Sequence, residues 1–65
     1  MSKNELFTMI LDILANEYKL NIIEEVNIFE EAMNSTDILF NRNGENVTDC
    51  EIRKCLFNRY EDYLY

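Results

Sequence analysis

The feature that most constrains this chain is its near lack of turn-forming residues. Its 65 residues contain no proline and a single glycine, Gly44. A fold built from many short strands needs many turns, and such turns depend strongly on these two residue types. Hydrophobic residues make up 48% of the chain and charged residues 29%, which is a globular composition. The sequence therefore favours one small domain, residues 1–65, made of a few helices.

The first segment reads as a helix with an unusually broad apolar face. Ser2 and Glu5 match a capping box, and apolar residues follow at helical spacing until about Asn16 to Tyr18. This face is wider than two short helices can cover, and small domains often gain core by oligomerising. The sequence thus predicts a homodimer, to which the C-terminal tyrosines could add contacts. Its interface would comprise Leu6, Phe7, Ile10, Leu11 and Leu14.

The middle of the chain allows more than one interpretation. A second helix is expected from Asn21 as the N-cap to a stop at Asn34–Ser35, because four apolar residues recur at i, i+4, i+7 and i+11. A strand over residues 20–28 is the alternative. Residues 36–47 favour a hairpin-like loop turning at Asn43–Gly44. They also allow one or two helical turns from a Ser35 cap that end at Gly44.

The last segment reads as a clear helix. Thr48 and Glu51 match a second capping box, and Ile52, Leu56 and Tyr60 then share one face. The predicted fold class is therefore mainly α: a small three-helix bundle with a short irregular or hairpin-like segment before the last helix.

Composition excludes several classes of function. A net charge of −7 is unsuited to direct nucleic-acid binding and to an anionic membrane surface. The chain has no histidine, no glycine-rich phosphate loop and no spacing typical of a zinc or calcium site. We therefore expect neither an enzyme nor a cofactor.

The two cysteines and the first residues bear on compartment. Cys50 and Cys55 lie five apart in one expected helix, about 140° apart around its axis, so they cannot bridge each other. We expect reduced thiols, with Cys55 in the core; an intermolecular disulfide or a reactive Cys50 is the alternative. The N-terminal segment lacks the pattern of a secretory signal or a membrane span. These features favour a cytoplasmic protein, in the host cytoplasm if a virus encodes it.

The charge distribution gives the main functional hypothesis. No basic residue occurs between Lys19 and Arg42, so the acidic residues there could form one surface for a basic, nucleic-acid-handling protein partner. On one helix, carboxylates seven residues apart stand about 10 Å apart, which is in the range of phosphate spacings. A nucleic-acid mimic is thus conceivable, and a merely solubilising surface is the alternative. The partner-binding residues would be these carboxylates and tyrosine anchors: Glu24, Glu25, Glu30, Glu31, Asp37, Tyr60, Tyr63 and Tyr65.

Two likenesses extend this hypothesis. Nine asparagines and seven isoleucines suggest an AT-rich coding sequence, and the chain resembles in type the short acidic inhibitors that phages and mobile elements direct against host defence, such as anti-CRISPR proteins. Residues 6–31 and 51–65 are also similar to the first helix and loop and to the last helix of acyl carrier proteins. That resemblance implies a prosthetic group on Ser35, although Asn34-Ser35-Thr36 replaces the family's Asp-Ser-Leu. A small structural or regulatory subunit is a further alternative.

Overall fold

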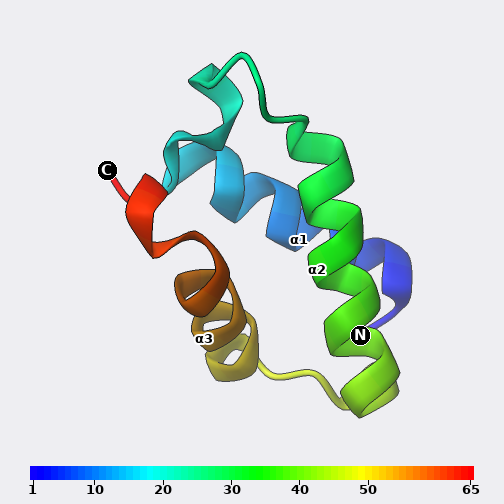
Figure 1. Cartoon of the computed structure of the whole chain (residues 1–65). Helices are drawn as coiled ribbons and strands as arrows, with labels where there is room; N and C mark the ends of the chain where they lie inside the picture. The colour runs from blue at the N-terminus through cyan, green and yellow to red at the C-terminus, as the bar shows by residue number, and fades with distance from the viewer.

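The computed structural model describes all residues, Met1–Tyr65, and forms three α-helices without a β-strand (Figure 1). The helices are α1 (Lys3–Asn16), α2 (Ile28–Asn43) and α3 (Asp49–Tyr60). Short 3-10 segments follow each helix, at Lys19–Ile22, Gly44–Asn46 and Glu61–Tyr63. One isolated antiparallel bridge joins Tyr18 to Leu64, beside the C-terminus. The predicted mainly-α three-helix fold is confirmed.

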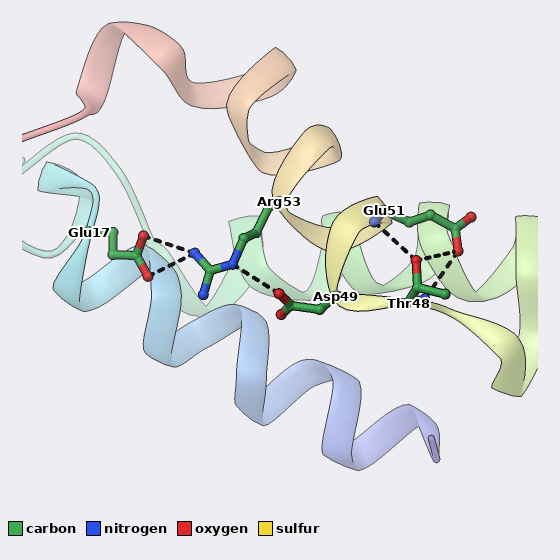
Figure 2. A network of polar contacts seen from close by, with 5 residues as sticks. All are labelled: Glu17, Thr48, Asp49, Glu51 and Arg53. Carbon is green, nitrogen blue, oxygen red and sulfur yellow. Dashed lines mark hydrogen bonds and ion pairs between the residues drawn. The ribbon is translucent and has the colours of Figure 1, made fainter.

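Both predicted capping boxes are present. The Ser2 hydroxyl accepts from the Glu5 amide at 3.2 Å, and the Glu5 carboxylate accepts from the Ser2 amide at 3.2 Å. At the start of α3, Thr48 and Glu51 exchange the same pair of bonds (Figure 2). Each box satisfies amide groups that a helix N-terminus otherwise leaves without partners. Both helices therefore begin where the sequence indicates.

The prediction for the middle of the chain is wrong. Asn27, not Asn21, caps the second helix: its side-chain oxygen accepts from the amides of Phe29 and Glu30 at 3.1 and 3.2 Å. The helix then runs through Ser35 to Asn43 and ends at Gly44, whose φ of 59° favours glycine. The stop at Asn34–Ser35, the hairpin-like loop and the alternative strand over residues 20–28 are therefore all absent. Only the alternative of a helix ending at Gly44 named the right terminus.

One core lies between the three helices. It contains Leu6, Ile10 and Leu14 of α1, which are fully buried within a single chain. α1 packs chiefly against α2 and against the 3-10 segment that contains Leu20, and its residues Phe7, Met9 and Leu11 stay partly exposed. The other buried apolar residues are Ile13, Ala32, Leu39, Val47, Ile52, Leu56 and Tyr60.

The burial of α1 corrects the predicted dimer interface. Leu6, Ile10 and Leu14 cannot contact a partner in this conformation, and Phe7 and Leu11 are half-buried against the core. Dimerisation itself stays a prediction, and of the five predicted residues only Phe7 and Leu11 keep exposed surface for it.

An ion-pair bridge ties the end of α1 to the start of α3. Arg53 donates to the Glu17 carboxylate at 3.0 Å and to Asp49 at 3.2 Å (Figure 2).

No helix has the length and apolar character that crossing a bilayer requires.

Candidate functional site

The acidic residues of the middle segment separate into two groups. Glu24 and Glu25 lie in the turn before α2, and Glu30 lies in its first turn; all three are exposed and make no ion pair. Asp37, by contrast, pairs with Lys3 at 2.9 Å. Glu31 lies 3.9 Å from Arg59. The fold thus brings basic side chains from elsewhere in the chain to Asp37 and Glu31. The other three of the five predicted carboxylates form no ion pair.

Glu31 belongs to a partly buried network that closes the contact between α2 and α3. The Tyr60 hydroxyl donates to the Glu31 carboxylate at 2.8 Å, accepts from Arg59 Nε at 3.2 Å and lies 3.1 Å from the Ser35 hydroxyl. The pKa of Tyr60 is raised, chiefly because burial disfavours the phenolate. This network is structural, and Glu31 is not available as a free recognition charge.

The predicted tyrosine anchors differ in exposure. Tyr60 is 5% exposed and packs edge-on against Tyr18, with ring centroids 6.4 Å apart. Tyr63 is half-buried, and Tyr65 is exposed. Tyr60 is therefore a core residue, and only Tyr63 and Tyr65 remain as surface anchors.

The structure exposes three of the four apolar side chains whose helical spacing predicted the second helix; the four are Ile22, Val26, Phe29 and Met33. Phe29 and Met33, one turn apart on α2, are 62% and 48% exposed, and Ile22 before the helix is 67% exposed. The exposed carboxylates Glu24, Glu25 and Glu30 lie in the same stretch of sequence, and we call these six residues, all within residues 22–33, the acidic–apolar edge. The signal that could have found it is Asn27 with Glu30 three residues later, which is the pattern of a helix start.

Other predicted sites find little support in the geometry. The Ser35 hydroxyl has no exposed surface and lies in the middle of α2, so a phosphopantetheine arm has no access to it. Cys50 is exposed and Cys55 is half-buried, and both are free thiols. No cluster of acidic and cysteine residues could hold a metal ion.

Two shallow grooves flank α3. One lies beside Tyr18, Cys50 and Phe57, and the other lies between α2 and α3. The largest hollow runs along the outer face of α1, from Met1 to Ala15.

Comparison with protein-family models, with curated proteins and with solved structures finds no match to this chain.

Proposed function

We propose that this protein binds a basic protein partner through the acidic–apolar edge and thereby blocks or modulates that partner. The observation that carries the proposal is the exposure of Phe29 and Met33 in a segment whose carboxylates Glu24, Glu25 and Glu30 make no ion pair within the chain. Interfaces commonly combine a desolvated apolar centre with a charged rim. Here Phe29 and Met33 would form the centre, and Glu24, Glu25 and Glu30 would form the rim.

The partner's chemistry follows from the same edge. It needs an apolar pocket for Phe29 and lysines or arginines around that pocket. Nucleic-acid-handling proteins carry such basic surfaces. The chain shares small size, acidity and the lack of a catalytic pattern with anti-defence inhibitors, so inhibition of a nucleic-acid-handling enzyme is the role we propose.

The geometry alters one detail of the mimic hypothesis. Glu24 lies outside α2, and Glu31 is bonded to Tyr60, so the two do not form a phosphate-like pair on one helix. Any imitation of a nucleic-acid backbone would have to use Glu24, Glu25 and Glu30. Their rim would mainly accelerate association, since charge complementarity acts on the encounter rate.

The exposed surface of this protein is large enough for an interface of standard size. A standard interface buries about 800 Å² on each partner. That is about a fifth of the 4274 Å² that this protein exposes. The acidic–apolar edge would therefore be the centre of a footprint that extends onto neighbouring surface.

The test begins with capture of the partner from cells of the source organism and continues with binding kinetics. Replacing Glu24, Glu25 and Glu30 with glutamine should lower the association rate and its salt dependence. A matched control neutralises three other exposed carboxylates that make no ion pair: Glu45→Gln, Glu61→Gln and Asp62→Asn.

A second variant tests the apolar centre. Phe29→Ala should accelerate dissociation by about tenfold or more, because a buried aromatic anchor dominates such interfaces. The proposal fails if the control variant slows association as much as the edge variant does. It also fails if Phe29→Ala leaves the dissociation rate unchanged.

A further inference from the structure

The groove between α2 and α3 gathers half of the chain's basic side chains. Arg42 comes from α2, and Lys54 and Arg59 come from α3. Ile38, Cys55 and Asn58 also line the groove. The whole chain has 6 lysines and arginines and a net charge of −7. Three of those six cations at one groove make a local exception to an acidic molecule.

Arg42 and Lys54 are available to a ligand, whereas Arg59 already donates through Nε to the Tyr60 hydroxyl at 3.2 Å. Arg42 and Lys54 form no ion pair, and the contact of Arg59 with Glu31 is long, at 3.9 Å. The one carboxylate in the lining, Glu51, already accepts hydrogen bonds from Thr48 and Asn43. The lining of the groove therefore carries three positive charges and one negative charge, that of Glu51.

Arg42 and Arg59 come from different helices and line one groove together with Cys55. Burial raises the pKa of the Cys55 thiol, and the positive charges of Arg59 and Arg42 both oppose that rise. The Cys55 thiol therefore serves as a reporter on this groove.

The carboxylates of the acidic–apolar edge lie too far from the groove to repel an anion there strongly. Glu30 and Arg42 lie 12 residues apart on α2, which corresponds to about 18 Å along the helix. Charges in water at physiological salt are screened over about 8 Å. The free carboxylates at the N-terminal end of α2 therefore weaken anion binding at this groove only slightly.

We propose that this groove binds a small multivalent oxyanion of the phosphate class. The planar guanidinium of Arg42 matches phosphate oxygens in paired hydrogen bonds, and Arg59 and Lys54 add positive charge. The Asn58 amide supplies a neutral donor. The groove's volume of about 410 Å³ suits a small ligand. The site shares no residue with the acidic–apolar edge, so it goes beyond the protein-binding proposal and does not depend on it.

The test is a titration of the ¹⁵N-labelled protein with sodium pyrophosphate at constant ionic strength, followed by amide NMR shifts. Saturable shifts should concentrate at Arg42, Lys54, Cys55 and Arg59. Arg42→Gln should weaken this binding by about tenfold, as expected for loss of one charged contact. The matched control is Lys19→Gln, which removes the same charge from an exposed residue outside the groove and should leave the affinity unchanged.

Alkylation of Cys55 gives a second readout in a Cys50→Ser background. Bound pyrophosphate should slow the reaction of the Cys55 thiol with iodoacetamide in the parent and less so in Arg42→Gln. Citrate, a multivalent carboxylate, distinguishes the ligand class, because it should bind more weakly than pyrophosphate. Shifts that do not saturate, equal weakening by Lys19→Gln, or equal binding of citrate would each overturn the assignment.

Discussion

The hydroxyl of Tyr60 offers a sharp test of how α2 and α3 hold together. Tyr60→Phe removes a single oxygen at a site that is 5% exposed. It deprives the Ser35 hydroxyl, which has no exposed surface, of a partner at 3.1 Å. It also deprives the Glu31 carboxylate of a donor at 2.8 Å. The ring itself stays, so packing in the core is almost unchanged.

The magnitude follows from the burial of Ser35. A buried polar group left without a partner costs about 1–3 kcal/mol. Ser35 lies within α2, and its hydroxyl can turn to the carbonyl four residues earlier, as Thr36 does to Ala32 at 2.7 Å. We therefore expect Tyr60→Phe to lower the free energy of unfolding by about 1–2 kcal/mol. In a domain of this size that corresponds to a fall in Tm of about 4–16 °C.

The assay is urea denaturation followed by circular dichroism, arranged as a double-mutant cycle with Ser35→Ala. The double variant removes both polar partners, so its loss should be smaller than the sum of the two single losses by about 1 kcal/mol. Tyr65→Phe is the control, because Tyr65 is exposed and its hydroxyl makes no hydrogen bond within the chain. Strict additivity of the two substitutions, or a loss for Tyr65→Phe equal to that for Tyr60→Phe, would refute this reasoning.

Three further predictions concern the core, the caps and the ion-pair bridge. Leu14→Ala should cost about 2–5 kcal/mol in thermal or urea unfolding, whereas Ile22→Ala at an exposed site should cost less than about 0.5 kcal/mol. Hydrogen bonds from the capping residues lower the pKa of Glu5 and Glu51 below the ordinary 4.5. The stabilisation from these carboxylates should therefore be full above about pH 4.5 and should fall as the pH drops through the lowered pKa values. A urea midpoint that stays constant down to about pH 3 would contradict this. Arg53→Gln should lower the urea midpoint slightly at low NaCl and not at high NaCl, because its ion pairs are half exposed; equal losses at both salt levels would argue against an electrostatic bridge.

The starts of α1 and α3 were predictable because each has a capping box, whereas the simpler Asn27 cap of α2 was missed. Ser2 with Glu5 and Thr48 with Glu51 are self-contained motifs, so α1 and α3 begin where the sequence indicates. The first helix also ends near Asn16 as expected, and Gly44 marks the end of α2. These signals lie within a few residues of each other and need no knowledge of the rest of the chain.

The second helix was misplaced because its apolar stripe is exposed and its buried face is partly polar. Residues 22, 26, 29 and 33 predicted a buried face, but the face that enters the core carries Ala32, Ser35, Thr36 and Leu39. Small residues let α2 approach its neighbours, and the two hydroxyls are satisfied by Tyr60 and by the Ala32 carbonyl. Hydrophobicity alone could not favour that orientation.

The site was only partly predictable for a related reason. Whether a carboxylate is left without an ion pair depends on which lysines and arginines the fold brings near it. Lys3 pairs with Asp37, and Arg59 lies near Glu31, although both basic residues come from distant parts of the chain. Sequence distance could not indicate these pairings. Glu24, Glu25 and Glu30 form no such pair, so three of the five predicted carboxylates keep a free charge, and their part in recognition stays a prediction.

The acidic residues at the start of α2 and the basic residue at its end also stabilise the helix itself. The best test of the proposed function therefore uses carboxylates that lie outside the helix. Glu30 and Glu31 lie in the first turn and Arg42 in the last, which is the arrangement that the helix macrodipole favours. Glu30 therefore contributes to stability as well as to any encounter with a partner. Glu24 and Glu25 lie before the helix and make no ion pair, so neutralising them should leave the urea midpoint unchanged. A Glu24→Gln/Glu25→Gln protein that keeps its stability and loses association rate would separate recognition from folding, whereas an unchanged rate would assign these carboxylates to solubility alone.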